Sequence, residues 1–201
     1  MLKDYEDFYR DGGFNYNQHT EKYKKWLFEK TSINSYNKDC TVLDVGCGDG
    51  FWSFLLASKF NVTGIDISKA GIDVANKKVT NLNIKNINFV CGNALEIEQK
   101  FDLIFCRGPS FLNLPPSDER FVENLKKMLS ICNLGLIYIQ STKKPYGRWS
   151  KSSLFDERAD SEYYNSRWYY HDPDELEKLF GKFGDAKVRD IDSYIVAEIH
   201  K

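Results

Sequence analysis

Residues 42–50 of the chain read Val-Leu-Asp-Val-Gly-Cys-Gly-Asp-Gly, and this stretch decides the fold. An apolar strand reaches an acidic residue, and a glycine-rich turn then leads into an apolar segment typical of a helix. Glycines let a ligand approach bare backbone, and the N-terminus of the following helix offers free N–H groups. The stretch therefore predicts the opening of a nucleotide-type binding site in an α/β fold.

The spacing of the glycines indicates which ligand this loop binds. A dinucleotide-binding loop has the pattern G-x-G-x-x-G, whereas Gly46, Gly48 and Gly50 follow G-x-G-x-G. Phe51 stands where the third fingerprint glycine would fall. Asp49 also lies inside the loop, and its carboxylate would repel a pyrophosphate but not a sulfonium cation. The loop therefore suits S-adenosylmethionine better than NAD.

This loop is close to the first motif of the class I S-adenosylmethionine-dependent methyltransferases, and the next elements continue the resemblance. A helix segment is predicted over residues 51–57 and a second strand over residues 61–65. That strand ends at Asp66, about 22 positions after Asp44, which fits the usual separation of a ribose-binding acid from the first strand. The resemblance implies that Asp66 binds the ribose hydroxyls.

The third to fifth strands extend the resemblance. A strand predicted over residues 87–90 runs into Cys-Gly-Asn-Ala at 91–94, where the family usually has Gly-Asp-Ala. Asn93 departs from that pattern, but its amide oxygen can still accept a hydrogen bond from an adenine amino group. The strand predicted over residues 101–106 matches the family's fourth motif, and residues 134–140 form the fifth strand.

The fold implied by the resemblance is α/β, with a Rossmann-like seven-stranded sheet in the order 3-2-1-4-5-7-6 and helices on both faces. One-sided apolar periodicity predicts helices over residues 117–132 and after Ser68. Asp172 begins a further helix as its N-cap, with proline at the first helical position. Residues 187–191 and 194–199 are predicted to form the closing antiparallel hairpin.

The resemblance also implies where the cofactor is held, in the loops after strands one to four. The residues expected to bind S-adenosylmethionine are Asp44 and the backbone of Gly46, Cys47 and Gly48 at the methionine part, Asp66 at the ribose, Asn93 and Ala94 at the adenine, Cys106 near the sulfonium, and Ile67 in the same set.

Composition is consistent with a single domain over residues 1–201, which are 42% hydrophobic and 28% charged. A formal net charge of −1 gives no long-range attraction to nucleic acid or to an anionic membrane, which argues against both as main partners. No apolar run of about 18 residues and no signal-peptide pattern is present, so a cytoplasmic location is expected. Five scattered cysteines without a C-x-x-C pair predict reduced thiols and no metal site.

Two regions lie outside the core motifs. Residues 1–35 hold an aromatic segment with Phe14 and Tyr16, followed by an amphipathic helix with Trp26. Residues 141–170 form a connection far longer than ordinary loops of about 4–6 residues and are rich in tyrosine and tryptophan. We expect the first region to be a lid and the second a substrate-side insertion, in which a few rings face the ligands through cation–π contacts. The alternative is that the rings only cover apolar edges.

Methyl transfer asks little of the protein, because a nucleophile only has to be held in line behind an already activated methyl group. A base that titrates near neutrality helps when the acceptor is a hydroxyl or an ammonium group. The candidates are His19, in the expected lid, and His171, before a helix N-terminus that would disfavour its charged form. Each could equally be a surface or capping residue. Tyr16 and Tyr146 are further candidates.

Arg107 is the third candidate catalytic residue, since it follows the fourth strand, whose end faces the methyl group in this family. The Cys-Arg-Gly-Pro sequence at 106–109 differs from the Asn-Pro-Pro-Tyr motif of many amino-group methylases of nucleic acids and proteins. Arg107 could instead hold a carboxylate or phosphate on a small acceptor. Other basic residues could join it or form a solvated loop, and these are Lys143, Lys144, Arg148 and Lys151.

These patterns predict an S-adenosylmethionine-dependent methyltransferase for a small-molecule acceptor, with an anionic acceptor and O-methylation favoured over N-methylation. Two alternatives remain open. One is an RNA or protein methyltransferase, in which the basic stretch would grip a polymer and binding would depend steeply on salt. The other is a protein that binds S-adenosylmethionine without catalysis. The oligomeric state is left open.

Overall fold

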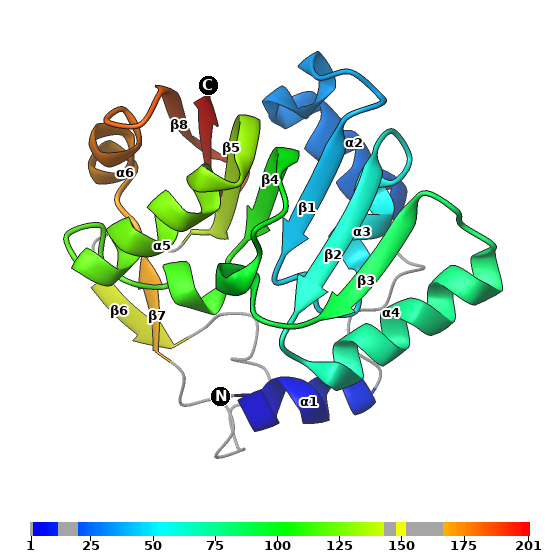
Figure 1. Ribbon diagram of the computed structural model, residues 1–201. Coiled ribbons are helices and arrows are strands. Elements are labelled where there is room, and N and C mark those ends of the chain that lie inside the picture. Colours follow the sequence, from blue (N-terminus) through cyan, green and yellow to red (C-terminus); the bar gives the residue numbers. More distant parts are fainter. Residues whose placement is uncertain (1, 12–19, 143–147, 152–166) are drawn as a thin grey trace.

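The computed structural model describes residues 2–11, 20–142, 148–151 and 167–201 (Figure 1). These residues form a seven-stranded sheet flanked by helices and a separate two-stranded ribbon. The strands of the sheet are β1 (Thr41–Val45), β2 (Asn61–Asp66), β3 (Ile87–Cys91), β4 (Phe101–Arg107), β5 (Cys132–Ser141), β8 (Asp185–Ile191) and β9 (Tyr194–His200). The ribbon consists of β6 (Arg148–Lys151) and β7 (Arg167–Tyr170). The helices are α1 (Leu2–Arg10), α2 (Thr20–Lys30), α3 (Phe51–Leu56), α4 (Lys69–Leu82), α5 (Glu119–Ser130) and α6 (Pro173–Phe180), with short 3-10 helices η1 (Ser32–Ser35), η2 (Ala94–Glu96) and η3 (Ser110–Leu112).

The strand order in the sheet is β3-β2-β1-β4-β5-β9-β8. Strands β1 to β5 run parallel to one another. Strand β9 is antiparallel to β5, and β8 is antiparallel to β9. Because β6 and β7 lie outside the sheet, β8 and β9 are its sixth and seventh strands, and the order is the expected 3-2-1-4-5-7-6. The predicted Rossmann-like fold is confirmed, and the parallel strands place their carboxyl ends at one edge.

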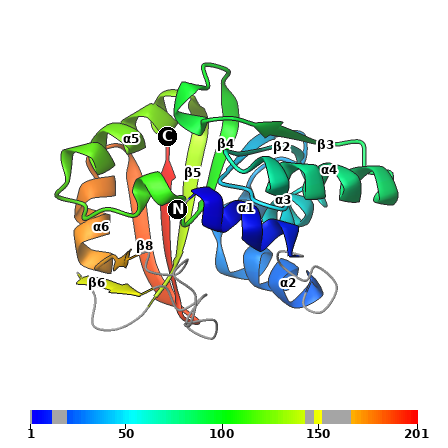
Figure 2. The ribbon, with the colours of Figure 1, turned by 90° about the horizontal axis from the view of Figure 1, so that it is seen from below.

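Helices cover both faces of the sheet, as predicted (Figure 2). On one face, α5 and α6 contribute Phe121 and Phe180 to a core. The same core includes Leu43 and Val45 of β1. On the other face, α2, α3 and α4 contribute Leu27, Phe54 and Ala75 to a second core. Strands β1 and β4 are buried on both faces, which explains why their sequences are almost continuously apolar.

The helix starts follow the predicted capping residues. The Ser68 hydroxyl accepts a hydrogen bond from the Gly71 N–H, 3.1 Å away, at the beginning of α4. The Asp172 carboxylate accepts hydrogen bonds from the N–H groups of Asp174 and Glu175, at 2.9 and 3.2 Å, at the beginning of α6. Each cap satisfies N–H groups that have no partner inside the helix, so these helix boundaries could be predicted from local sequence.

Two elements were not predicted from the sequence. The first is α1, a helix of only nine residues that docks on α4, where the Glu6 carboxylate accepts a hydrogen bond from the Ala70 N–H, 3.1 Å away. A helix this short depends on such packing, since isolated short helices are marginal in water. The second is the β6–β7 ribbon, in which residues 148–151 of the 141–170 connection pair with residues 167–170. Local periodicity does not reveal such pairing.

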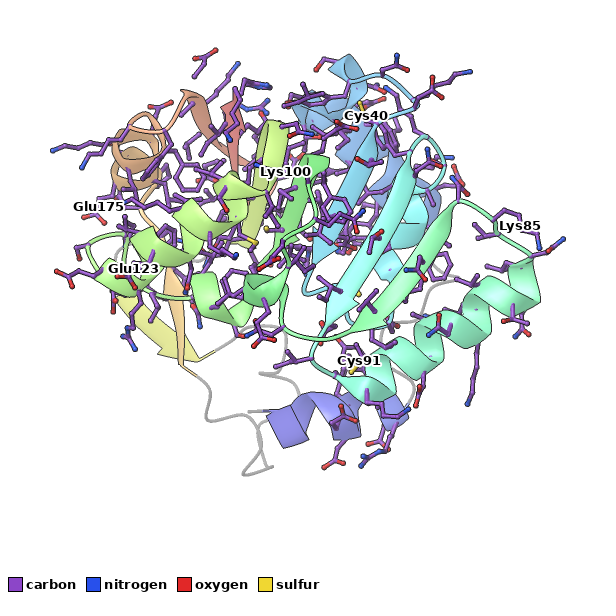
Figure 3. The ribbon with its side chains drawn as sticks, viewed as in Figure 1. Cys40, Lys85, Cys91, Lys100, Glu123 and Glu175 are labelled. Carbon is purple, nitrogen blue, oxygen red and sulfur yellow. The ribbon has the colours of Figure 1, made fainter. Side chains whose placement is uncertain are left out.

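The carboxyl edge of the parallel strands is the edge that α1 covers (Figure 1). Figure 3 shows Cys91, the last residue of β3, at this edge, close to the beginning of α4. Cys40 and Lys100, which precede β1 and β4, lie at the opposite edge. The loops predicted to bind the cofactor therefore lie at the same edge of the sheet as α1. Within the described ranges, no helix is both long and apolar enough to cross a bilayer.

Candidate functional site

The loop between β1 and α3 follows a backbone path that favours glycine. Gly46, Gly48 and Gly50 have φ angles of +73°, +55° and +82°, in the left-handed region where a Cβ is strained. The N–H groups of Gly46 and Cys47 both donate to the carbonyl of Ile65, at 2.9 and 3.1 Å. These bonds fix the loop against the end of β2. The glycine pattern thus sets the shape of the loop, and the backbone of Gly46 is exposed.

Tyr9 of α1 covers part of this loop. Its side chain is only 6% exposed, and a Cβ on Gly48 would overlap its hydroxyl. A Cβ on Gly71, at the start of α4, would lie 3.1 Å from the Tyr9 ring. The close approach of an N-terminal helix therefore depends on two residues without side chains. The sequence shows Tyr9 in an aromatic segment but gives no sign of this contact.

Asp66 is held in the position expected of a ribose-binding acid. One carboxylate oxygen accepts a hydrogen bond from the Gly48 N–H and the other from the Ser68 N–H, both at 2.8 Å. Burial raises the pKa of Asp66 above its ordinary value, and these two hydrogen bonds act in the opposite direction. Each oxygen keeps lone-pair capacity for a ligand hydroxyl. The structure thus brings the glycine loop and Asp66 together.

Asp44 is almost fully buried, with 1% of its surface exposed. Its carboxylate accepts a hydrogen bond from the Ser53 hydroxyl of α3, 2.5 Å away. Burial raises the pKa of Asp44 to about 7, while the Ser53 hydrogen bond and the charge of Arg107 lower it. In this conformation Asp44 therefore supports the loop from behind, through α3. Its contact with the methionine part of the cofactor stays a prediction.

The surroundings of Asp49 contradict the repulsion of a pyrophosphate that the sequence predicted. Its carboxylate is 1% exposed and pairs with Lys78 of α4, whose ammonium nitrogen lies 3.0 Å away. The Asp49 charge is therefore compensated by a neighbouring cation, and it does not present the repulsion to a pyrophosphate that the sequence suggested. The glycine pattern retains its value for discriminating between ligands, whereas Asp49 instead ties the loop to α4.

Three further positions predicted to bind the cofactor, Ile67, Asn93 and Ala94, differ in what they offer a ligand. Ile67 is 50% exposed and Asn93 is also exposed. The Asn93 amide caps η2, where its oxygen accepts from the Leu95 N–H at 3.0 Å and its nitrogen donates to the Glu96 carboxylate at 3.1 Å. Ala94 is 6% exposed and packs into the core. Ile67 and Asn93 are therefore the accessible members of this set.

Cys106 is not accessible. It is fully buried and packs in the core under α5, because alternation along β4 directs residue 106 to that face. Its thiol therefore cannot contact a ligand in this conformation, and this expectation is corrected. Cys47 is also buried, with 8% of its surface exposed. Burial raises the pKa of both thiols well above its ordinary value, which is consistent with inert, reduced cysteines.

Arg107, the next residue of β4, lies on the opposite face and reaches the site. Its guanidinium carbon is 5.2 Å from the centre of the Trp52 ring and 5.7 Å from that of Tyr194. Its Nε atom is buried and has no hydrogen-bond partner within the described residues. The Arg107 charge also lowers the pKa of Asp44. Arg107 is thus a half-buried cation beside the glycine loop.

The surroundings of His171 contradict its predicted role as a base. It is fully buried, with Nε2 2.8 Å from the Leu114 carbonyl and Nδ1 3.2 Å from the Tyr138 hydroxyl. Burial lowers the pKa of His171 to about 4, so the neutral form expected from the helix N-terminus is present, but burial is its cause. With both ring nitrogens occupied inside the core, His171 joins the loop after β4 to β5 and does not face a ligand.

Several predictions fall outside the described residues. They concern His19, Phe14 and Tyr16 of the expected lid, Tyr146 of the insertion, and Lys143 and Lys144. In the described part of the chain, no group of three or more His, Cys, Asp or Glu side chains is arranged to hold a metal ion.

The aromatic residues around Arg107 are the main feature that sequence reasoning missed. Trp52 comes from α3, Tyr194 from the beginning of β9, and Tyr23 from α2, with its ring centre 5.8 Å from that of Trp52. The sequence showed Tyr23 on an amphipathic helix and Tyr194 after a turn, both ordinary positions for packing residues. No local signal places either one beside a residue 84 or more positions away in the chain.

Comparison with known proteins supports the same architecture. The family model for methyltransferase domains matches residues 36–182. The matched range begins after α2 and ends after α6, so it contains the glycine loop, Asp66 and Arg107 and leaves α1 and α2 outside.

Two curated relatives are similar over part of the chain. Malonyl-[acyl-carrier protein] O-methyltransferase of Priestia megaterium is 36% identical over 83 residues, which are 39% of this chain and 29% of that protein. Demethylmenaquinone methyltransferase of Listeria monocytogenes is 30% identical over 118 residues, which are 55% of this chain and 48% of that protein. The matched segments thus span less than half of either relative.

A solved structure is similar over nearly the whole chain. The complex named DhpI-SAM-HEP has a TM-score of 0.70 with this structure and covers 98% of this chain and 94% of its own, at 17% sequence identity. At that identity the likeness concerns the fold. It includes the N-terminal region that the family model leaves out.

Proposed function

Because this chain belongs to the class I S-adenosylmethionine-dependent methyltransferase family, we propose that it transfers the methyl group of S-adenosylmethionine to a small-molecule acceptor. One observation carries the proposal. The glycine loop and Asp66, at the ends of β1 and β2, lie at the same edge as a half-buried cation, Arg107, at the end of β4. Since β1 lies between β2 and β4, a cofactor site and an acceptor site can adjoin there.

The residues at the cofactor side fit S-adenosylmethionine, which supplies an activated methyl group when bound. Gly46 presents exposed backbone to the ligand, and Asp66 offers a fixed carboxylate for the two ribose hydroxyls. Ile67 follows with an exposed apolar side chain suited to an adenine face, and Asn93 with an exposed amide. Asp44 and Cys47 hold the loop from inside the protein.

The acceptor side supports an anionic small molecule. Arg107 is the charged side chain that reaches the site from β4, and its Nε donor has no protein partner in the described residues. A guanidinium offers several N–H donors in one plane and binds carboxylates and phosphates well. The Arg107 side chain would therefore orient the acceptor, and orientation supplies much of the rate of a methyl transfer.

The groups that could move a proton favour O-methylation over N-methylation. The described histidines lie away from the site, with His171 buried in the core and His200 bonded to the Tyr36 hydroxyl. An acidic oxygen acceptor is already ionised near neutral pH and needs no base, whereas an ammonium acceptor must first lose a proton. The names of the two curated relatives give different acceptors, so these names do not identify the acceptor of this chain.

Two substitutions test the division between cofactor and acceptor sides. Asp66→Ala should weaken the binding of S-adenosylhomocysteine at least tenfold, because a hydrogen bond to a charged group contributes about 1.5–3 kcal/mol. Arg107→Met should leave that affinity nearly intact but raise the KM for anionic acceptors, since removing one partner of a sheltered charged pair costs about 2–5 kcal/mol. Calorimetry and turnover of carboxylate and phosphate acceptors measure the two effects.

The same measurements distinguish the alternatives. Equal affinity of Asp66→Ala and the parent for S-adenosylhomocysteine would refute the cofactor placement. Turnover of RNA or protein with a steep salt dependence would indicate a polymer substrate. Tight cofactor binding with no turnover over a wide acceptor panel would indicate a non-catalytic binding protein. If Arg107→Met lowers the melting temperature and weakens both ligands, Arg107 only joins the loops.

A further inference from the structure

We propose that Tyr23 of α2 and Tyr194 of β9 determine acceptor specificity by binding the anionic group of the acceptor together with Arg107. The inference rests on the proposed function, because it concerns the acceptor of the same methyl transfer. The three side chains come from segments more than 80 positions apart that meet at the carboxyl edge of the sheet. The anionic group is a carboxylate or a phosphate, since both present oxygens to such donors.

The two tyrosines lie beside Arg107 and its aromatic neighbours. Burial and the neighbouring Tyr194 phenol raise the pKa of Tyr23, the Arg107 charge lowers it, and the Tyr194 ring centre lies 5.7 Å from the guanidinium carbon of Arg107. The Tyr23 ring packs edge-on against Phe51 and Trp52, at 5.5 and 5.8 Å between ring centres. The two phenol rings and the guanidinium thus lie in one cluster that the glycine loop adjoins.

Both the charge and the hydrogen-bonding capacity of this cluster suit an oxyanion. The buried Nε donor of Arg107 has no hydrogen-bond partner within the described residues, and a buried donor is costly without an acceptor. Burial is the main factor that raises the pKa of Tyr23 above its ordinary value, so this phenol keeps its proton at neutral pH. A phenol hydroxyl is a hydrogen-bond donor and can donate to a ligand oxygen.

The position of Tyr194 is fixed from outside the cluster. The indole N–H of Trp26 donates to the Asp192 carboxylate, 3.1 Å away, and the Trp26 ring lies 4.9 Å from the Tyr194 ring. These contacts attach α2 to the turn between β8 and β9. That turn holds Asp192 and Ser193 with φ of +52° and +69°, which is strained for residues with a Cβ. The Tyr194 ring is therefore held in place before a ligand arrives.

The test compares ligand binding to the full chain saturated with S-adenosylhomocysteine. The probes are benzoate and phenyl phosphate, with benzamide as a neutral probe of similar shape, titrated by ligand-observed NMR. The variants are Tyr23→Phe and Tyr194→Phe, which keep the rings and remove the hydroxyls. Tyr36→Phe is the matched control, because its hydroxyl bonds to His200 at the opposite edge of the sheet.

We expect at least one anionic probe to bind at least tenfold more tightly than benzamide, and each of the two variants to weaken it about tenfold. The probe that loses more affinity identifies the group as carboxylate or phosphate. Melting temperature, S-adenosylhomocysteine affinity and benzamide affinity should stay unchanged, and Tyr36→Phe should bind the anionic probes like the parent.

Three results would overturn the inference: no preference of the parent for either anion over benzamide, unchanged anion affinity in both variants, or an equal loss for benzamide and the anions, which would indicate packing only. These failures are distinct from failure of the proposed function. A parent chain that does not bind S-adenosylhomocysteine contradicts the methyltransferase proposal itself. Normal cofactor binding together with unchanged anion affinity in both tyrosine variants contradicts only the role of the tyrosines.

Discussion

At the scale of single residues, Asp44 is a carboxylic acid that its surroundings push toward the neutral form. It lies at the end of β1 with 1% of its surface exposed, and burial raises its pKa to about 7. Ser53 donates a hydrogen bond to it, and the charge of Arg107 favours its ionised form. A buried acid in this state costs folding energy at neutral pH, which is a common feature of functional sites.

Asp44→Asn should therefore change how stability depends on pH. The folded-state pKa of Asp44 is raised above its unfolded value of 3.8, so the parent loses stability as the pH rises from about 4 to about 7, at up to about 1.4 kcal/mol per pH unit from this group. Asparagine does not ionise and can still accept the Ser53 hydrogen bond. Urea unfolding at pH 4.5 and 7.5 should show that the free energy of unfolding of the variant increases relative to that of the parent as the pH rises.

A matched substitution distinguishes this effect from a general one. Asp73→Asn changes an exposed carboxylate on α4, and its stability should differ from the parent by nearly the same amount at both pH values. If the Asp44→Asn and parent curves run parallel between pH 4.5 and 7.5, Asp44 is ionised normally in the folded protein and the account of its burial is wrong.

At the scale of elements, the turn between β8 and β9 carries strain that serves the site. Ser193 has a φ of +69°, where glycine is favoured over residues with a Cβ. Ser193→Gly should raise the free energy of unfolding by about 0.5–1 kcal/mol, because the strain of a left-handed residue exceeds the added chain entropy of glycine. Thermal or denaturant unfolding measures the change.

Asp192→Gly is the informative comparison, since Asp192 has a similar φ of +52° but also accepts the Trp26 hydrogen bond. Relief of strain and loss of that bond should offset one another, so this variant should be less stable than Ser193→Gly. A Ser193→Gly variant that is less stable than the parent would show that the turn is unstrained and that the serine stabilises it.

At the scale of the whole molecule, α1 joins two parts of the cofactor site. Glu6 accepts a hydrogen bond from Ala70 at the beginning of α4, and Tyr9 covers Gly48 of the glycine loop. A cofactor that contacts the loop and Asp66 must lie close to this helix. Helix α1 lies outside residues 36–182, the range matched by the methyltransferase family model, and the similarity to the DhpI-SAM-HEP structure extends over 98% of the chain.

Cofactor binding should therefore slow hydrogen exchange in α1. Saturation with S-adenosylhomocysteine should protect the amides of residues 6–11 and of the loop over residues 46–50, because the ligand would stabilise the packing between them. Exchange near Lys100, at the opposite edge of the sheet, should not change. Unchanged protection in α1 at saturation would contradict a role of this helix as a lid.

The sequence by itself determined the features that depend on neighbouring residues. The glycine spacing at 46–50 set a left-handed loop, Asp172 set the start of α6, and the apolar segments set the strands of the sheet. Glycine conformation, capping and periodicity act over a few positions, so they can be read from a short stretch of chain. Together with the family resemblance, they were sufficient for the strand order and for placing Asp66 beside the loop.

Only the tertiary structure decided what surrounds each candidate side chain. It buried His171 against Tyr138, paired Asp49 with Lys78, and brought Tyr194 to Arg107. The bond between Trp26 and Asp192 joins residues 166 positions apart. Such contacts depend on how whole elements pack, and packing is set by the combined shape of many side chains and not by any local pattern. Whether a titratable residue supports the core or faces a ligand is therefore decided by packing.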